Sequence, residues 1–465
     1  MALAIRGVRV RRRVSEVLAV ASVAVGIAAG PAPAVDRVSA PGDIAWVARH
    51  DQGSAFNESA SVVVASPAGA RIFETGIDYT SNFTYVTVAN DAATGSELWS
   101  ATYDAGYVSS KVSLAVSPDG AVVYLAGPYF NGLGQSEADT VAYDASTGQQ
   151  LWVNRYSGPT QRAEMDGLAV SPDGTTLFET GSAWNGTNDD LVTLAIDAAT
   201  GVRRWVNRLP GPGQEYLRGQ AVAVSSAGDL VFAAAIRQPD PNPIDYVIVA
   251  HDAATGARRW VAKYDAPGDD PGYPVAIALS PDDRRVFVTG WSSGSQGAMG
   301  FGTVALRADT GVQIWSDTFG SSGSPDDLSV SPDGQTVVVV GALVPGGFTT
   351  VAYDAATGDR RWSDSLEQGW AKSTVVSLDS GTAFVSGWST GAGEQSFQTV
   401  AYAVSSGATL WWRRFGASPC SYGNDVALAP DGSLLYVTGK IPDLVEGCGS
   451  EFSAGDYGTV AYRTT

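Results

Sequence analysis

A unit of 47–55 residues is repeated along most of this chain, and this repeat constrains the fold more than any other feature. Its most regular mark is a tryptophan, and from Trp99 onward a glycine stands four residues before each of these tryptophans. The tryptophans are Trp46, Trp99, Trp152, Trp205, Trp260, Trp315, Trp362 and Trp411. Self-similarity of this length indicates a fold built from one module, whose neighbouring copies bury each other's apolar faces.

Each unit is predicted to form four short strands. In the second unit, residues 112–116 and 122–126 are rich in β-branched residues, and Pro118-Asp119-Gly120 between them is a tight-turn sequence. Residues 140–143 form the third strand, and the strand after the 144–148 turn carries Trp152. No segment of the repeats has the period of a helix of ten or more residues. The pattern predicts an all-β fold, an eight-bladed β-propeller with four-stranded antiparallel blades, and an open β-solenoid is the alternative.

The two ends of the repeat region complement each other. The last copy stops after its third strand, at residues 459–465, and lacks the strand that carries tryptophan. A strand of that kind, with Trp46, lies at the other end, at residues 44–50. We therefore expect the eighth blade to be built from both ends of the repeat region, which removes two exposed strand edges.

The first 34 residues have the composition of a secretory signal peptide rather than of a folded segment. Five arginines precede an apolar run, and Ala32-Pro33-Ala34 is a small-residue cleavage site. Residues 35–43 are interpreted as a linker and residues 44–465 as one propeller domain. The chain is expected to be secreted or to reside in the cell envelope, and to have no membrane span, because the apolar run is too short.

The charge of the chain limits its partners. The net charge is −19, and removal of five Arg and one Glu with residues 1–34 makes it −23. A strongly acidic protein is repelled by nucleic acid and by anionic membranes, so nucleic-acid binding is not expected. The remaining candidates are a small molecule, a glycan or a protein, bound by a monomer. The alternative is that the acidity only keeps the protein soluble.

Two cysteines, Cys420 and Cys448, are present. Both fall in predicted loops that emerge on the same face of an up-and-down blade. An even number of cysteines in an exported chain favours a disulfide, which would fix the closing blade.

The predicted loops divide the propeller into two faces. The short turns, Ser-Pro-Asp-Gly and Asp-Ala-Ala-Thr-Gly, alternate with longer loops along every blade and must share one face. The longer, variable loops, at residues 127–138, 181–190, 290–302 and 439–458, share the other, which we call the loop face. Function is expected on the loop face, near the mouth of the central channel.

Carboxylates are expected around this mouth. Eight are predicted there: Glu137, Asp166, Asp190, Asp245, Asp326, Asp327, Asp425 and Asp456. Gathered carboxylates can hold Ca²⁺, a hard cation that takes six to eight oxygen ligands. No Asp-x-Asp-x-Asp loop is present, and the alternative is that these side chains cap the backbone where strands begin.

Aromatic residues form a second candidate set on the loop face. Trp184, Trp291 and Trp388 fall outside the repeat column of tryptophans, and Tyr129 and Phe130 lie in an equivalent loop. Such residues could stack on a sugar or on a planar ligand. The alternative is that they pack between blades beneath the loops.

The motif Ala-x-Asp-x-x-Thr-Gly-x-x-x-Trp, at residues 142–152, 195–205, 250–260 and 352–362, resembles the tryptophan-docking motif of quinoprotein (PQQ-dependent) dehydrogenase propellers. That family is eight-bladed, and the resemblance implies that the repeated tryptophans stack between neighbouring blades. The Ser-Pro-Asp-Gly turns also look like those of YVTN-type propellers. Outer-membrane assembly lipoproteins resemble the same propeller, but no lipobox cysteine follows the signal here.

The catalytic parts of that family have no counterpart in this sequence. There is no adjacent cysteine pair to cover PQQ and no Glu-Asn-Asp calcium set, so PQQ binding is not expected. The two histidines, His50 and His251, belong to no cluster. The sequence therefore favours a non-catalytic scaffold that binds a ligand or protein. A PQQ- and Ca²⁺-dependent oxidoreductase and a glycan-active lyase or hydrolase with paired carboxylates are the alternatives.

Overall fold

The structure is a computed structural model, and it describes residues 39–50, 58–78, 84–106, 111–131, 135–211, 215–238, 245–264, 272–293, 299–345, 347–366, 368–391, 394–416, 421–442 and 455–465. Residues from Ala40 to Thr465 form one compact unit. The predicted signal peptide, Cys420 and Cys448 lie outside the described residues. No helix within the described ranges is long and apolar enough to cross a membrane.

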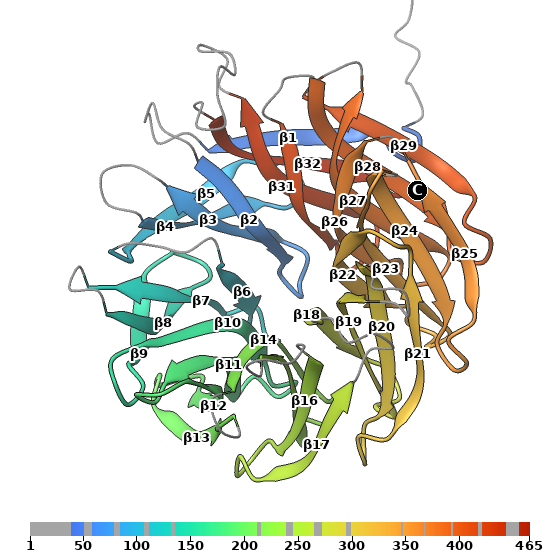
Figure 1. Ribbon diagram of the computed structural model, residues 1–465. Coiled ribbons are helices and arrows are strands. Elements are labelled where there is room, and N and C mark those ends of the chain that lie inside the picture. Colours follow the sequence, from blue (N-terminus) through green and yellow to red (C-terminus); the bar gives the residue numbers. More distant parts are fainter. Residues whose placement is uncertain are drawn as a thin grey trace, which may run out of the picture. The chain divides into compact units, whose positions relative to one another are not determined.

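The compact unit is an eight-bladed β-propeller, as predicted, with eight four-stranded antiparallel sheets arranged around a centre (Figure 1). We number the blades in chain order. The first four are blade 1 with β2 (Glu58–Ala65), β3 (Arg71–Asp78), β4 (Thr84–Asp91) and β5 (Glu97–Asp104); blade 2 with β6 (Ser113–Val116), β7 (Val122–Phe130), β8 (Ser136–Asp144) and β9 (Gln150–Tyr156); blade 3 with β10 (Ala163–Val170), β11 (Thr176–Trp184), β12 (Asp189–Asp197) and β13 (Arg203–Leu209); and blade 4 with β14 (Tyr216–Val224), β15 (Leu230–Gln238), β16 (Asp245–Asp252) and β17 (Arg258–Tyr264).

The second half of the ring repeats this plan. Its strands are β18 (Tyr273–Leu279), β19 (Arg285–Ser293), β20 (Met299–Arg307) and β21 (Gln313–Phe319) in blade 5; β22 (Gly323–Val330), β23 (Thr336–Leu343), β24 (Gly347–Asp354) and β25 (Arg360–Ser365) in blade 6; β26 (Gly369–Val376), β27 (Thr382–Gly391), β28 (Glu394–Ala403) and β29 (Thr409–Phe415) in blade 7; and β30 (Tyr422–Leu428), β31 (Leu434–Pro442), β32 (Gly455–Arg463) and β1 (Ile44–His50) in blade 8. In every blade the first strand lies nearest the centre (Figure 1).

Both ends of the repeat region build blade 8, which confirms the predicted closure. Strand β1 pairs antiparallel with β32, with Val47 opposite Val460. Two backbone hydrogen bonds extend this pairing, from Gly42 N to Arg463 O (2.7 Å) and from Arg463 N to Asp43 O (2.9 Å). The predicted linker, residues 35–43, therefore contributes its last residues to the fold.

The repeated tryptophans join each blade to the next. The indole Nε1 of Trp99 donates to the backbone oxygen of Ala145 in blade 2 (3.1 Å), and six others make the same bond around the ring. The indole ring lies on the turn glycine of the next blade, Gly148, which has φ +72°. A Cβ atom on Gly148 would lie 2.6 Å from Trp99 Cε3, so only glycine fits there.

Blade 8 has no third-to-fourth-strand turn, because the chain is interrupted there. Gly42, from the segment before β1, takes the place of the turn glycine, with φ +80°. A Cβ atom on Gly42 would lie 2.9 Å from Trp411 Cδ2. The eighth tryptophan thus lies on a glycine like the other seven, although the glycine comes from the other end of the domain.

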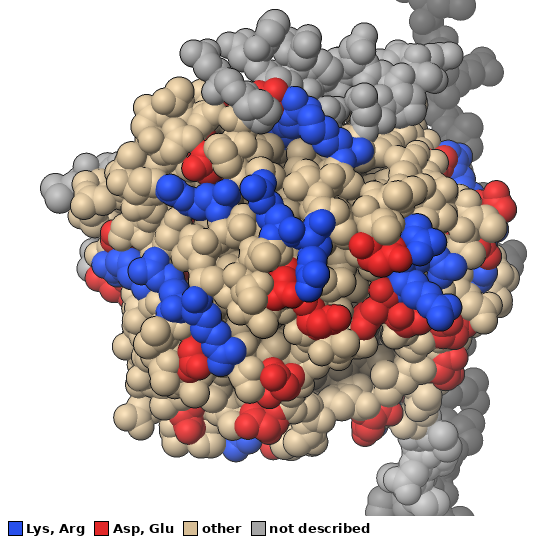
Figure 2. Space-filling view, turned by 90° about the horizontal axis from the view of Figure 1, so that it is seen from below, with Lys and Arg blue, Asp and Glu red and all other residues tan. Residues whose placement is uncertain are grey.

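The core of the propeller lies between blades, in apolar clusters shared by neighbouring sheets. One such cluster joins Phe73 and Trp99 of blade 1 to Leu125 and Tyr143 of blade 2. The face of the propeller that carries the short turns is called the turn face. Turns of neighbouring blades lie close together there, because a Cβ atom on Gly120 would lie 3.5 Å from Cδ of Pro67 in the preceding blade. Arginines of the outer strands pair with the first aspartate of their own turn, as in Arg361–Asp354 (2.8 Å). Figure 2 shows such rows of basic residues beside acidic ones.

The predicted long loops are shorter than expected, because the second and third strands of the blades extend into them. Strand β7 runs on to Phe130, and β8 begins at Ser136, within the loop predicted at 127–138. In blade 3 only four residues separate β11 from β12. Aromatic side chains at these strand ends pair with neighbours across the sheet, which favours strand over loop.

The contact between tryptophan and turn glycine can be tested with two alanine variants. Gly148→Ala adds backbone strain and a clash with Trp99, whereas Gly432→Ala has the same φ region (+73°) but its Cβ atom would lie 3.6 Å from the nearest atom, Leu378 Cδ1. Strain costs both variants about 1–2 kcal/mol. We expect Gly148→Ala to lose about 2 kcal/mol more unfolding free energy in denaturant titrations. Equal losses would contradict the docking role of the glycine.

Candidate functional site

β-Bulges occur in the innermost strands, at the centre of the propeller where the sequence predicts the mouth of a central channel. In seven blades, one residue of the first strand is skipped in the pairing with the second strand. The skipped residues are Ser61, Asp166, Gln220, Val275, Asp326, Lys372 and Asn424. A bulge redirects its side chain away from the regular alternation of a strand. We call these residues the bulge ring.

Side chains of three consecutive blades meet on one part of the ring. Lys111, which precedes β6, donates from Nζ to Gln220 Oε1 (2.6 Å) and lies 3.6 Å from Asp166 Oδ2. Gln220 Nε2 lies 3.4 Å from the same carboxylate oxygen. Burial raises the pKa of Asp166, and the charge of Lys111 opposes this shift. The Lys111 side chain remains 50% exposed, so this polar cluster faces solvent.

Two further charged residues lie beside this cluster, each two residues before the bulge residue of its strand. Burial, with the nearby Asp166 charge, raises the pKa of Glu164 in blade 3. Arg218 of blade 4 reaches back to Asp189 of blade 3, with Nη2 and Oδ2 2.6 Å apart, and its side chain is 54% exposed. The channel mouth on this side therefore presents both signs of charge.

A second cluster joins blades 6 and 7. Asp326 accepts a hydrogen bond from Lys372 Nζ (2.9 Å) and another from the indole nitrogen of Trp370. Lys372 also lies over the Trp370 ring, 4.4 Å from its centroid. Burial raises the pKa of Asp326, and Lys372 again opposes the shift. The carboxylate is thus held between a cation and an indole of the next blade.

The residues after the bulges hold neighbouring inner strands together. Asp327 Oδ2 accepts from the backbone N of Thr374 (2.9 Å), and Asp425 Oδ2 accepts from the backbone N of Val63 (2.9 Å). Between them, Ser373 Oγ lies 2.7 Å from Asp425 Oδ1 and 3.2 Å from Asp327 Oδ2. These two aspartates therefore cap strand backbone, the alternative considered for them, and join blades 6, 7, 8 and 1.

The seven predicted carboxylates whose side chains the structure describes do not form one constellation. Glu137 lies 3.5 Å from Arg155, Asp190 accepts from Asn185 Nδ2 (2.5 Å), and Asp456 lies 3.5 Å from Arg49. The Asp245 side chain lies outside the described residues. In the described part of the chain, no three His, Cys, Asp or Glu side chains gather as metal ligands. The described residues therefore do not provide the ligand set that Ca²⁺ takes.

The predicted aromatic residues lie on strand ends rather than on loops, and each has a partner. Trp291 stacks on Tyr273 of its own blade, with centroids 4.3 Å apart. Trp184 stacks on Tyr216 of the next blade at 6.4 Å, and Trp388 is the cross-strand neighbour of Trp370. Arg155 lies 3.7 Å above the ring of Tyr129. Phe130 ends β7, and its backbone N donates to Ala105 O. The five residues lie on four blades and form no common surface.

Sequence reasoning missed the bulge ring, although a signal for it exists. Each bulge residue stands five residues before the first residue of the next Ser-Pro-Asp-Gly type turn, as Asp166 does before Ser171 and Lys372 before Ser377. Comparison of this position in all copies of the repeat would have added Gln220, Lys372 and Asn424 to the candidate site. Asp166 and Asp326 stand at the same position. Lys111 lies one residue before the same column.

These features define a PQQ-like β-propeller. The family model described as outer membrane protein assembly factor BamB matches residues 82–239 and 244–432, and the chain belongs to this family. Among curated proteins, none matches the chain.

Solved structures share the fold at low sequence identity. The Dos1 propeller aligns with a TM-score of 0.59 and 13% identity, over 89% of this chain and 95% of that chain. The C-terminal WD40 domain of Sif2 aligns with a TM-score of 0.54 and 12% identity, over 90% of this chain and 99% of that chain. At these identities the similarity shows the fold alone.

The Asp327 carboxyl predicts a pH dependence of stability. Burial raises its pKa from 3.8 to about 7. Between these values the folded protein binds more protons than the unfolded chain, so stability decreases as pH rises from about 4 to 7. The Asp327→Asn variant has no ionisable group at this position. Its unfolding free energy, relative to that of the wild type, should therefore increase by on the order of 1–2 kcal/mol from pH 5 to pH 8. Denaturant titrations at both pH values measure this gain.

The control for this experiment is Asp359→Asn, which changes an exposed carboxylate on the turn face. Its unfolding free energy relative to the wild type should be the same at both pH values. A difference for Asp327→Asn that is also independent of pH would contradict the raised pKa.

Proposed function

We propose that this protein is a secreted, non-catalytic scaffold that binds a polar ligand or protein at the channel mouth on its loop face. The cross-blade cluster of Lys111, Asp166 and Gln220 is the observation that carries this proposal. It places the exposed cationic group of Lys111 next to the carboxylate of Asp166, on an innermost strand of a closed ring. Rigidly held groups of both charges favour a specific polar partner, because little ordering is needed on binding.

The chemistry of the mouth supports binding rather than catalysis. The carboxylates of Asp326, Asp327 and Asp425 are bonded to a lysine, an indole, a hydroxyl or backbone N–H groups, so each has a structural role. His251 is buried, and burial lowers its pKa to about 4. His50 ends the outermost strand of blade 8 and lies 2.8 Å from Glu97, away from the innermost strands.

The family description gives the proposal a further support, because it names an assembly factor. A role in assembly involves binding other proteins, and it suits a propeller that offers a broad face to a partner. The acidic mature chain and the signal-like residues 1–34 support a location outside the cytoplasm.

A thermal-shift panel with Ca²⁺, PQQ, and neutral and acidic oligosaccharides tests the mouth as a binding site. A ligand at about 100 times its Kd adds about 2.7 kcal/mol to stability. A mouth ligand should raise the unfolding midpoint of the wild type but not that of Lys111→Ala/Arg218→Ala. The control is Arg258→Ala/Arg259→Ala, which removes the same charge from an outer strand and should keep the shift.

Turnover is the outcome that opposes the scaffold proposal. If purified protein oxidised alcohols or sugars when supplied with PQQ and Ca²⁺, the oxidoreductase alternative would replace it. We expect no reduction of a dye acceptor above the rate seen with PQQ and Ca²⁺ alone.

The export part of the proposal can be tested on the purified exported protein. We expect its intact mass to correspond to a chain that begins near Val35, with Cys420 and Cys448 joined by a disulfide. Thiol titration in denaturant should then find no reactive thiol before reduction and two after it. A mature chain that keeps residues 1–34, or two thiols before reduction, would contradict this part.

A further inference from the structure

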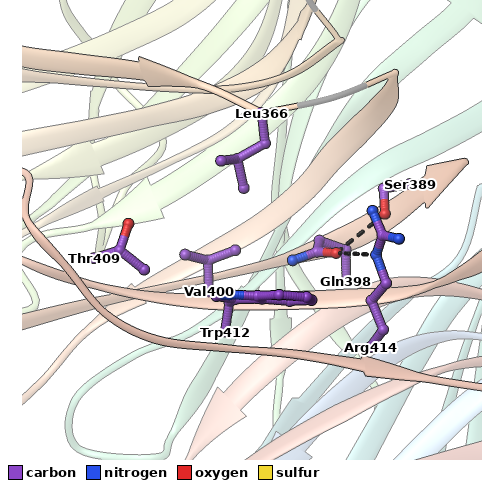
Figure 3. Close-up of a pocket in the computed structure, with 7 residues that line it drawn as sticks. All are labelled: Leu366, Ser389, Gln398, Val400, Thr409, Trp412 and Arg414. Carbon is purple, nitrogen blue, oxygen red and sulfur yellow. Dashed lines mark hydrogen bonds between the residues drawn. The ribbon is translucent and has the colours of Figure 1, made fainter. Parts of the chain in front are cut away.

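A cavity of about 410 Å³ lies between blades 6 and 7, on the outer strands and away from the bulge ring. Its walls come from Leu366 after β25, from Gln398 and Val400 on β28, and from Trp412 and Arg414 on β29. Figure 3 shows Leu366 on one side of the space and the flat indole of Trp412 on the other. The volume is in the range of small-molecule sites.

A polar group is aimed into this cavity. The Gln398 side chain is 3% exposed, and its Oε1 accepts from Ser389 Oγ (3.0 Å) and from Arg414 Nε (3.1 Å). These two bonds fix the amide, so its Nε2 end is turned toward the space between Leu366 and Trp412 (Figure 3). Within the part of the chain that the structure describes, no group accepts the Nε2 hydrogens. The Nε2 hydrogens can therefore be donated to a molecule in the cavity.

The same place in the groove between blades 1 and 2 is filled by the protein itself. Tyr103 stands four residues after its docking tryptophan, as Leu366 does, and its hydroxyl donates to Asp139. Asp139 is the cross-strand partner of Arg155, as Gln398 is of Arg414, and the two form a bidentate ion pair with both distances 2.7 Å. There a six-membered ring with a hydroxyl occupies the groove and saturates the polar pair.

Other blades close the groove in similar ways. The position of Leu366 holds Tyr or Phe in five blades, namely at Tyr103, Tyr156, Tyr264, Phe319 and Phe415. In blade 3 it is Leu209, and Val247 and Val249 of the next blade pack against it. In blade 6 the smaller Leu366 packs against a cluster that includes Val400 of the next blade, and it faces Gln398 where the blade 1–2 groove has Asp139.

Trp412 has no counterpart in the repeat. The residue after the docking tryptophan is valine or serine in every other blade: Val47, Ser100, Val153, Val206, Val261, Ser316 and Ser363. Trp412 is 54% exposed, and Arg414 lies 5.7 Å from its ring centroid. Blade 7 thus carries a large exposed aromatic side chain on the wall of the cavity, at a position where the other blades fold with valine or serine.

We propose that this cavity is a glycan-binding site, separate from the channel mouth, that takes a neutral pyranose ring between Leu366 and Trp412. The C–H groups of a pyranose face can lie on the electron-rich face of the indole. Its hydroxyl oxygens can accept from Gln398 Nε2. The polar groups around the indole, from Ser389, Gln398 and Arg414, suit a ring with several hydroxyls better than a phenol with one.

Titration with maltotetraose, cellotetraose and chitotetraose, followed by calorimetry and tryptophan fluorescence, tests this proposal. The wild type should bind one of them and show a fluorescence change. Trp412→Val, which installs the residue found in other blades, should fold normally and weaken binding at least tenfold. Leu366→Tyr/Gln398→Asp, which copies the blade 1–2 groove, should abolish binding and keep the fold. Lys111→Ala/Arg218→Ala should bind as the wild type does.

Three results would overturn the proposal. The first is no binding of any of the three oligosaccharides to the wild type at about 10 mM, a concentration that detects even weak sites. The second is unchanged affinity in Trp412→Val. The third is binding of p-cresol, used as a phenol probe, by the wild type with no binding of the oligosaccharides.

Discussion

The stacking of each repeated tryptophan on the turn glycine of the next blade is the contact on which the structure depends. It combines an aromatic face, a backbone that approaches within van der Waals distance, and an indole hydrogen bond to a carbonyl oxygen. Because the indole reaches across the boundary, each blade sets the position of its neighbour. The ring of inner strands, and with it the geometry of the channel mouth, follows from repeating this contact.

The fold could be predicted from the sequence because its cause is local and repeated. Tryptophan, glycine and turn residues recur at fixed offsets, and the missing strand at one end matched the surplus strand at the other. The candidate site was harder to predict, because it depends on differences among the repeats. Tyr129 and Trp291 were assigned to loops by sequence, whereas cross-strand partners extend the strands through them. The sequence places Asp326 and Asp425 among the candidate site residues but does not identify their partners, which lie on other blades. Lys372, the partner of Asp326, is 46 residues away, and Val63, the partner of Asp425, lies far earlier in the chain.

Two kinds of departure from the repeat carry the functional argument. At the channel mouth, one strand position varies among Ser, Asp, Gln, Val, Lys and Asn in seven blades, while the bulge that redirects the side chain is kept. At the outer groove between blades 6 and 7, three positions differ from most other blades: leucine replaces an aromatic residue at Leu366, an amide stands at Gln398, and an indole is added at Trp412. Coordinated change within a regular frame is more informative than any single residue, because the other blades show what the frame alone requires.

The origin of Gly42 and β1 has a consequence for how the domain is made. Ile44 lies opposite Tyr462, so the last sheet cannot form until nearly the whole polypeptide is available. Seven sheets can assemble from neighbouring segments, but the eighth requires the closure of a loop that spans almost the entire domain, with a correspondingly large entropic cost. During synthesis or translocation, β1 therefore remains without its partner strand until β32 is available, and the ring stays open until then. Because β32 lies between β1 and β31, loss of its nine residues would leave β1 without a partner strand and would expose one edge of β31, which stays paired with β30.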